Sequence, residues 1–333
     1  MSLTIKHLNA DASFLLTFQP FTTPAPTASA HGKGKAPAHV PGSFSIVIDP
    51  WLSGSVENVH PKVQYTRNLV PSCISSLKEL AEAPDVVLIS QAKSDHCHEE
   101  TLVQLPTTGK KTTYILAEPA AAKKIKGWKH FLPSLVHPLE AFDEKKKDKS
   151  LHRFTLPALH QERGTPGEVA IAFIPDKWDM TGLHNAVGIT YRAPTATGRK
   201  DGKPGPCLSI IYTPHGIPYP LLERYVSSHL AKEGALPLSL LLHSFDRVEN
   251  PWWLGGTLLA GLPGGIDIAK NLYPRAWISA HDGEKENRGA VVHNLKTVRY
   301  SHTDVEAALK DEYSAHTDVL VMEPGAEYKI SVA

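Results

Sequence analysis

The fold and the candidate site are indicated most clearly by residues Val86–His98, which read Val-Val-Leu-Ile-Ser-Gln-Ala-Lys-Ser-Asp-His-Cys-His. Its first four residues form a short apolar run rich in β-branched side chains, which predicts a buried strand. The run changes abruptly into a polar loop that contains Asp95 and His96. Side chains at the end of a rigid buried strand are held well enough to bind a metal ion or to take part in catalysis.

Other predicted strands also end in a histidine or an aspartate. The full set of these strand-end groups is Asp49, Asp95 with His96, His160, His215, His243 and His281. Loops from several strands of a layered α/β protein commonly converge on one site, and histidine and carboxylate groups are ligands for zinc, iron and manganese. A single such histidine is more simply explained as a hydrogen-bonded residue of the core or surface. The whole set would require several coincidences, so it predicts a metal centre.

Composition and charge narrow the classes of partner. The chain has 333 residues, of which 41% are hydrophobic, and this is enough for a sizeable core. Its 35 basic and 34 acidic side chains give a formal charge of +1. No general attraction to nucleic acid or to an anionic membrane follows from that balance. We expect a small-molecule substrate, no nucleic-acid or membrane partner, and leave a homo-oligomer open.

Cysteine content and the N-terminal sequence indicate a cytoplasmic protein. Three cysteines scattered through the chain do not suggest a disulfide framework, which favours a reducing compartment. The N-terminal residues lack the basic and apolar segments of a signal peptide, and no apolar run approaches membrane-spanning length.

Predicted strands and helices follow one another along the chain without a break in composition. This pattern predicts a single α/β domain over residues 1–333, with flexible insertion loops at residues 22–42 and 193–206. Helical spacing of apolar residues predicts a helix over Ser72–Glu82. Two short apolar runs, Val319–Met322 and Glu327–Val332, predict a C-terminal hairpin around an intervening Pro-Gly pair.

The order of these elements resembles the metallo-β-lactamase superfamily, particularly its lactonase-like branch, which opens ascorbate-6-phosphate lactone. Three motifs carry the resemblance: Ala12-Ser13-Phe14-Leu15-Leu16, Ile48-Asp49-Pro50-Trp51-Leu52-Ser53-Gly54 and Ile278-Ser279-Ala280-His281. The resemblance implies a four-layered αββα sandwich with the metal at one edge, between the two sheets.

The central motif of that family, His-x-His-x-Asp-His, is only half present. It stands here as Gln91-Ala92-Lys93-Ser94-Asp95-His96, so both leading histidines are replaced. By the resemblance, His160 takes the position of the third motif histidine. The first metal site of the family would then consist of Gln91, Lys93 and His160. An ammonium group has no lone pair to offer, so this set is not a metal site.

The second metal site of the family is intact in this chain. By the resemblance, His215 replaces a metal-bridging aspartate and His281 takes the position of the last histidine. The implied ligands are Asp95, His96, His215 and His281, and each is a competent ligand. The resemblance therefore implies a mononuclear site for one divalent metal, zinc by family habit, with iron and manganese left open by the ligand set. Asp49 is expected to orient a ligand histidine or a lysine by hydrogen bonding from behind.

Two functions remain in competition. The first is a metal-dependent hydrolase of a lactone, ester or amide, in which Lys93 replaces the first metal as a fixed positive charge. A salt bridge that only fills the vacated position explains Lys93 equally well. The residues expected in catalysis are Lys93, Asp95 and His160, and those expected in the substrate pocket are Trp51, Gln91, His243 and Asp246. The second function is a non-hydrolytic descendant: a pseudoenzyme, a ligand-binding protein, or a lyase, decarboxylase or oxygen-using enzyme.

Overall fold

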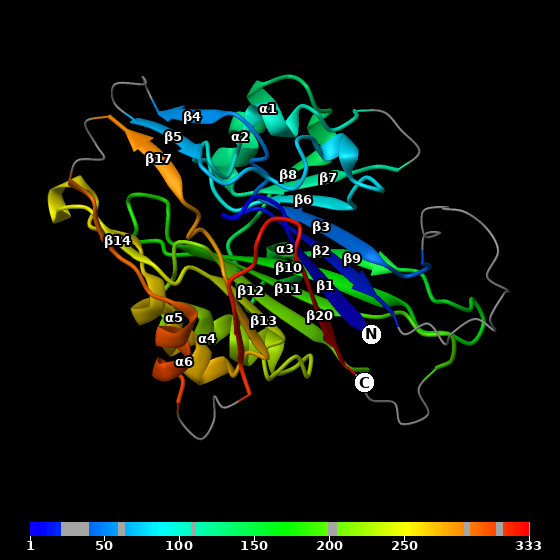
Figure 1. Ribbon diagram of the computed structural model, residues 1–333. Coiled ribbons are helices and arrows are strands. Elements are labelled where there is room, and N and C mark those ends of the chain that lie inside the picture. Colours follow the sequence, from blue (N-terminus) through cyan, green and yellow to red (C-terminus); the bar gives the residue numbers. More distant parts are fainter. Residues whose placement is uncertain are drawn as a thin grey trace, which may run out of the picture.

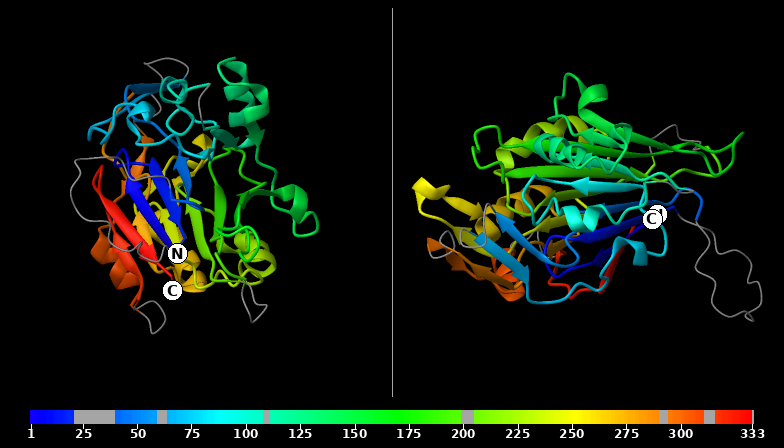
Figure 2. Two further views of the ribbon diagram at one scale, coloured as in Figure 1. Left: turned by 90° about the vertical axis from the view of Figure 1, so that its right-hand side faces the viewer. Right: turned by 90° about the horizontal axis from the view of Figure 1, so that it is seen from above.

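The structure is a computed structural model of the 333-residue chain, and it describes residues 1–20, 40–58, 64–107, 111–198, 205–289, 294–310 and 316–332. Two seven-stranded sheets lie face to face in the middle of the molecule, with helices outside them (Figure 1). Figure 2 shows the same layers from two further directions. The predicted four-layered αββα sandwich is confirmed.

The first sheet carries the organising stretch as one of its inner strands. Its order is β20 (Glu327–Ser331), β1 (Ser2–His7), β2 (Phe14–Gln19), β3 (Phe44–Ile48), β6 (Val86–Ile89), β7 (Tyr114–Ala117) and β8 (Val136–Pro138). The strands from β3 to β8 are parallel. All four residues of β6 are fully buried, as expected for an apolar strand covered on both faces.

The second sheet supplies the other strand ends of the predicted site. Its order is β19 (Asp318–Leu320), β16 (Ala276–Ser279), β13 (Leu240–His243), β12 (Leu208–Thr213), β11 (Asn185–Arg192), β10 (Gly167–Pro175) and β9 (Leu151–Leu156). The strands β12, β13, β16 and β19 run parallel to one another.

Two small three-stranded sheets lie at one end of the sandwich. One consists of β15 (Thr257–Leu259), β14 (Arg247–Glu249) and β18 (Lys296–Val298), and the other of β17 (Lys285–Arg288), β5 (Gln64–Asn68) and β4 (Ser55–Asn58). In Figure 1 both project from the same end of the large sheets.

Helices cover the outer faces of both large sheets. Those on the first sheet include α1 (Glu99–Leu102) and α2 (Pro119–Gly127), and those on the second include α4 (Tyr219–Tyr225), α5 (Gly261–Leu272) and α6 (His302–Ala308) (Figure 1). The remaining helical segments are η1 (Leu77–Glu79), η2 (Pro133–Leu135), α3 (Lys147–Ser150), the π-helical η3 (Val226–Leu230) and η4 (Trp252–Leu254). Among the described helices, none is both long and apolar enough to cross a membrane.

Three apolar clusters correspond to the three interfaces between the four layers. The largest fills the space between the sheets and includes Phe14, Ile48, Ile189 and Ile278. A second lies between the second sheet and its helices, and a third lies between the first sheet and its helices. The strands that lead to the predicted site residues are therefore rigidly packed from both sides.

Several local predictions need correction. The expected helix over Ser72–Glu82 contains only the single turn η1. The expected C-terminal hairpin is wrong: β19 pairs with β16 in the second sheet, whereas β20 pairs with β1 in the first. Each strand satisfies the backbone groups of a different open sheet edge, which local sequence does not reveal. The predicted insertion loops fall largely on residues 21–39 and 199–204, which lie outside the described residues.

Candidate metal centre

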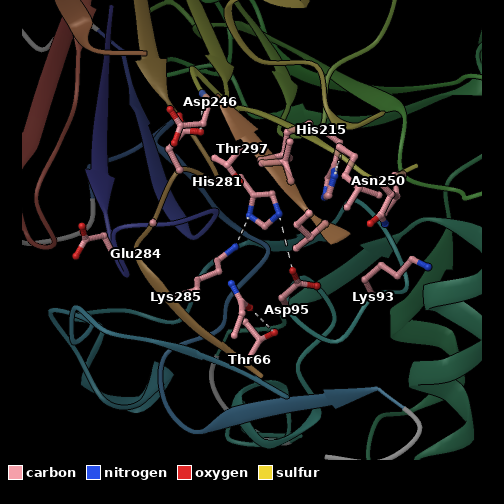
Figure 3. Close-up of a pocket in the computed structure, with 18 of the residues that line it drawn as sticks. Thr66, Lys93, Asp95, His215, Asp246, Asn250, His281, Glu284, Lys285 and Thr297 are labelled. Carbon is pink, nitrogen blue, oxygen red and sulfur yellow. Dashed lines mark hydrogen bonds and ion pairs between the residues drawn. The ribbon is translucent and has the colours of Figure 1, made fainter. Parts of the chain in front are cut away.

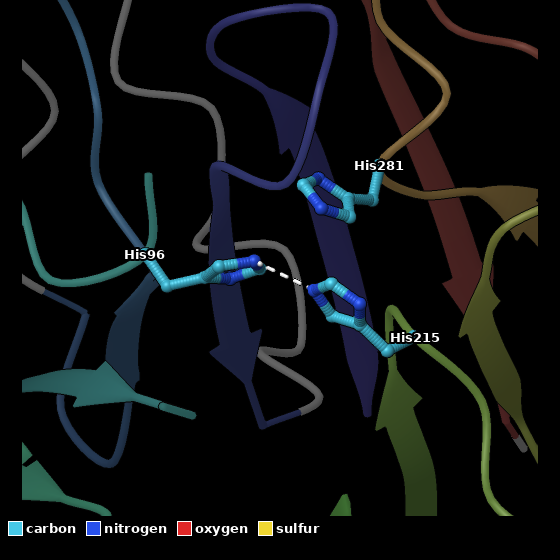
Figure 4. Close-up of side chains that lie close together, drawn as sticks. All are labelled: His96, His215 and His281. Carbon is cyan, nitrogen blue, oxygen red and sulfur yellow. Dashed lines mark hydrogen bonds between the residues drawn. The ribbon is translucent and has the colours of Figure 1, made fainter. Parts of the chain in front are cut away.

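Three buried histidines from distant parts of the chain meet between the ends of the two large sheets. His96 follows β6, His215 follows β12 and His281 follows β16. Their candidate ligand nitrogens all lie within 4.8 Å of one another (Figure 4). The ring centroids are 5.2 Å apart for His96 and His215, 4.7 Å for His96 and His281, and 4.6 Å for His215 and His281.

The outer nitrogen of each ring is anchored by a hydrogen-bond acceptor. The three pairs are His96 Nδ1 with Asp49 Oδ2 at 2.7 Å, His281 Nδ1 with Asp11 Oδ2 at 3.0 Å, and His215 Nδ1 with the Leu258 carbonyl oxygen at 2.8 Å. A ring that donates through Nδ1 carries its lone pair on Nε2. This arrangement directs three Nε2 lone pairs toward one point, as carboxylate- and carbonyl-supported histidines do at metal sites.

The spacing of the inner nitrogens fits a small cation. His96 Nε2 and His215 Nε2 are 3.1 Å apart. At this distance the two nitrogens form a hydrogen bond when one ring carries a proton at Nε2, and a bound cation would take the place of that proton when both rings donate through Nδ1. Imidazole nitrogens bind zinc at about 2.0 Å, which places neighbouring ligand atoms of a tetrahedral site about 3.3 Å apart. The distance between His96 and His215 is close to this value, and the three histidines together could hold a metal ion.

The Asp95 carboxylate faces the same point. Its Oδ2 lies 4.0 Å from His96 Nε2. The same oxygen lies 3.8 Å from His281 Nε2 (Figure 3). Burial by itself raises the pKa of Asp95, but the charges of His96, His281 and Lys285 outweigh it and lower that pKa. An ionised carboxylate at this distance is available as a fourth ligand or as a proton acceptor.

The charges around the histidines leave a deficit of two positive charges. Three carboxylates, Asp11, Asp49 and Asp95, lie against the imidazoles, and Lys285 is the ammonium among them. With neutral histidines, the three carboxylates and the one ammonium group carry a net charge of −2. A divalent cation brings that sum to zero, and buried unpaired charges are costly.

The histidine pKa values reflect the same distribution of charge. Burial disfavours the charged form of His96, yet Asp95 and Asp49 raise its pKa overall. Burial together with the neighbouring His281 and His96 lowers the pKa of His215 well below its usual value. Burial also lowers the pKa of His281, although Asp11 opposes this shift. Two of the three rings are thus held in the neutral, ligating form.

Asp49 is itself held by several donors. Its Oδ2 accepts hydrogen bonds from Ser90 Oγ at 2.5 Å and from Tyr212 OH at 2.7 Å, and its Oδ1 accepts from the Ser90 amide at 2.7 Å. The backbone of Asp49 has a φ of 40°, in the left-handed region. His281 also lies there, with a φ of 77°. Left-handed non-glycine residues cost of order 1 kcal/mol or more and concentrate at functional sites.

A pocket of about 350 Å³ opens beside the histidines, which is a size typical of small-molecule sites (Figure 3). Both three-stranded sheets contribute to its wall. The aliphatic lining residues are Leu183, Val248, Leu258, Leu259 and Leu295, and the polar ones include Thr66, Asp95, Asp246, Asn250, Asp282, Lys285, Asn287 and Arg299. Burial raises the pKa of Asp246 and raises that of Asp282 to about 7.

The structure brings some predicted pocket residues to this site and not others. Asp246 lines the pocket. Trp51, Gln91 and His243 are at most 1% exposed, and none of them lines the pocket. The backbone amide of Trp51 donates a hydrogen bond to Ser13 Oγ in the loop between β1 and β2. Both amide atoms of Gln91 and the Nε2 of His243 find no hydrogen-bond partner among the described residues. The position of these residues at or near strand ends does not reveal that their side chains point into the protein interior.

Lys93 and His160 do not reach the histidines. The Lys93 side chain is exposed at the pocket rim, and in Figure 3 its ammonium group points away from His281. His160 is exposed in the turn between β9 and β10. The other end of β10, at Pro175, lies next to the site. Pro175 pairs with Asn185, and the Asn185 side chain donates a hydrogen bond to the carbonyl oxygen of Ser90. The length of β10 therefore separates His160 from the metal centre by about 25 Å.

Two residues of the site escaped prediction from the sequence. Asp11 lies in the loop between β1 and β2, where a lone aspartate is typical of an ordinary turn. Lys285 follows His281 by four residues, and its Nζ lies 2.9 Å from Asp11 Oδ2 and 3.2 Å from His281 Nδ1. The spacing of Lys285 from His281 is the only local signal, and it is a weak one.

Comparison with known proteins supports the fold. Residues 39–154, roughly a third of the chain, match the model of the Beta-lactamase superfamily domain. This region contains Asp49, Asp95 and His96 but neither His215 nor His281. The match agrees with the superfamily resemblance, while the lactonase-like branch stays a prediction. No curated protein sequence gives a significant match.

Solved structures with similar folds have little sequence in common with this chain. Isothiocyanate hydrolase from Delia radicum gut bacteria is 12% identical, with 98% of each chain covered and a TM-score of 0.50. A diiron beta-hydroxylase from Streptomyces venezuelae is 12% identical over 99% of this chain and 54% of its own, with a TM-score of 0.51. A metallo hydrolase from the archaeon Ignicoccus hospitalis is 13% identical over both full chains, with a TM-score of 0.48. At this level of identity the similarity concerns the fold alone.

Proposed function

We propose that this protein is a metal-dependent hydrolase that acts on a small ester, lactone or amide with one divalent cation. The observation that carries the proposal is the convergence of the three Nε2 lone pairs of His96, His215 and His281, each fixed by an acceptor at Nδ1. The deficit of two positive charges around them supports a divalent ion. Zinc is the metal we propose, and the ligand types also suit iron and manganese.

A divalent cation held here would supply Lewis acidity, which makes water a better nucleophile and polarises a carbonyl group. The residues of the chain supply the remainder of the site. Asp49, Asp11 and the Leu258 carbonyl hold the imidazoles in the ligating tautomer. The Asp95 carboxylate, 24% exposed, faces both the histidines and the pocket, where it can accept a proton from water.

The pocket favours a small substrate of low net charge. Aliphatic side chains form much of its wall, and its acidic and basic groups nearly balance. Raised pKa values at Asp246 and Asp282 reduce its negative charge further. A substrate with an aliphatic portion and a single reactive carbonyl fits this lining better than a polyanion does.

The experiment compares metal content and hydrolysis in one set of variants. Purified protein is expected to carry close to one metal ion per chain by elemental analysis and to hydrolyse members of an ester and lactone panel. His281→Ala and His96→Ala should lose both the metal and the activity. The control is His302→Ala, an exposed histidine at the start of α6, which should keep both. Activity that persists after complete removal of the metal contradicts the proposal.

The same measurement of metal content and hydrolysis distinguishes the proposed hydrolase from the non-hydrolytic alternative. The replacement of the family's leading motif histidines by Gln91 and Lys93 motivates it, and so does the buried Gln91 amide, which has no hydrogen-bond partner within the described part of the chain. A protein that carries stoichiometric iron or zinc, and hydrolyses no member of the panel, favours this second function.

A further inference from the structure

Among the described residues, Lys285 is the lysine whose ammonium group contacts a candidate ligand histidine. It opens β17, which pairs with β5, and its side chain is 13% exposed. Lys285 lines the pocket, and its ammonium group lies 2.9 Å from Asp11 Oδ2. The same group lies 3.2 Å from His281 Nδ1 (Figure 3). The pairing of β17 with β5 fixes its backbone, so the charge is held in place.

The hydrogen bonds of His281 decide what Lys285 can do. Nδ1 of a neutral ring either donates to Asp11 or accepts from Lys285, but it cannot do both. The ligating form of His281 needs its lone pair on Nε2, so Nδ1 must donate to Asp11. Among the described residues, the Asp11 carboxylate is then the acceptor left for the ammonium group. Lys285 has three N–H donors and retains at least one for a ligand in the pocket.

The other cations of the pocket are placed differently. Lys93 is exposed and points away from the histidines (Figure 3). The Arg299 side chain is 74% exposed and pairs with the exposed Glu284 at 3.7 Å. Charges at the rim are screened by solvent, whereas a charge beside the buried histidines acts in a region of low dielectric.

We propose that Lys285 is a catalytic residue that donates a hydrogen bond to the carbonyl oxygen of the substrate, and this proposal rests on the proposed hydrolase function. In the reaction, the oxygen of water bonds to the acyl carbon while the carbonyl π pair moves onto oxygen. The carbon–heteroatom bond then breaks as that pair returns. One water proton ends on the leaving heteroatom, and the other remains with the acid product. Lys285 stabilises the oxygen while it carries the negative charge.

The test uses full-length, zinc-loaded protein with two probes. Methylphosphonate, a tetrahedral anion, is titrated calorimetrically, and 4-nitrophenyl acetate reports hydrolysis. Lys285→Met should keep one zinc per chain, weaken methylphosphonate binding at least tenfold and lower kcat by about 100-fold. The control is Lys6→Met, which removes another ion-paired strand lysine, 3.2 Å from Glu327, and should change none of these values.

Each outcome decides the role of Lys285. Unchanged methylphosphonate binding in Lys285→Met overturns the proposed catalytic role. Loss of zinc from this variant also overturns it, because Lys285 would then only hold Asp11 and His281. A wild-type protein that does not bind methylphosphonate overturns it as well. If the zinc-loaded protein hydrolyses no ester, the proposed function fails, and the methylphosphonate comparison still judges Lys285. Should Lys285→Met not fold, Lys285→Gln keeps a donor for Asp11 without the charge and is expected to behave in the same way.

Discussion

Replacing Asp11 by asparagine should weaken zinc binding by a factor of about 10 to 100 while the fold is kept. Asp11 is buried, and its Oδ2 accepts from His281 Nδ1 at 3.0 Å and from Lys285 Nζ at 2.9 Å. An asparagine amide can satisfy one of these donors with its oxygen, but its NH₂ group then faces another donor.

The magnitude follows from the two orientations of that amide. If its oxygen accepts from His281, its NH₂ group lies among donors that include the Gly283 amide, which is 3.3 Å from Asp11 Oδ1. If its NH₂ group faces His281, the ring must accept through Nδ1, so Nε2 carries the proton and cannot ligate. Either penalty is of the size of one charged hydrogen bond, and a 10- to 100-fold change corresponds to about 1.4 to 2.7 kcal/mol.

The assay is a competition titration of zinc against a chromophoric chelator, with the fold checked by circular dichroism. Removal of a negative charge alone also lowers affinity for a cation, so Glu284→Gln serves as the control. Glu284 lines the pocket, is 63% exposed and bonds to no ligand histidine. Equal zinc affinities in Asp11→Asn and Glu284→Gln would refute the idea that Asp11 fixes the tautomer of His281, because the loss of one negative charge would then explain the effect.

Three further predictions concern stability. Tyr212→Phe should lower the free energy of unfolding by about 1.5 to 3 kcal/mol in urea titrations, since a buried carboxylate loses a donor; a change below 0.5 kcal/mol speaks against it. Burial lowers the pKa of His243 to about 4, so the unfolded chain takes up this proton near pH 6.5 while the folded protein does not. Stability should therefore fall as pH drops from 6.5 to 4, and in His243→Gln the slope should be shallower by up to about 1.4 kcal/mol per pH unit. Equal slopes in both proteins argue against this assignment. Gly265→Ala should destabilise the protein by about 1 to 3 kcal/mol, because a Cβ there would lie 2.3 Å from the ring of buried Trp277. At Gly127, also helical, no atom of the described residues lies within 4 Å of an added Cβ, so Gly127→Ala should be neutral or stabilising in thermal melts.

Much of the fold could be predicted from the order of apolar runs. The strands β6, β12 and β16 are short and largely apolar segments, and every residue in each of them is buried in the structure. Because such segments are apolar on both faces, local sequence is enough to place them inside a layered protein. The strand-end pattern placed His96, His215 and His281 in one group with His160 and His243, and the family resemblance then narrowed that group to the three histidines that meet in the structure.

The partners of those histidines could not be found in this way. Asp11 and Lys285 come from a turn and a small sheet, and they lie beside His281 only because two sheets pack at that edge. His160 shows the converse: it follows a strand as the others do, but at the opposite end of β10. A sequence specifies that a strand ends in a polar residue. Which end of the sheet that residue occupies, and which side chains face it, depend on strand direction and long-range packing, and these exist only in the folded chain.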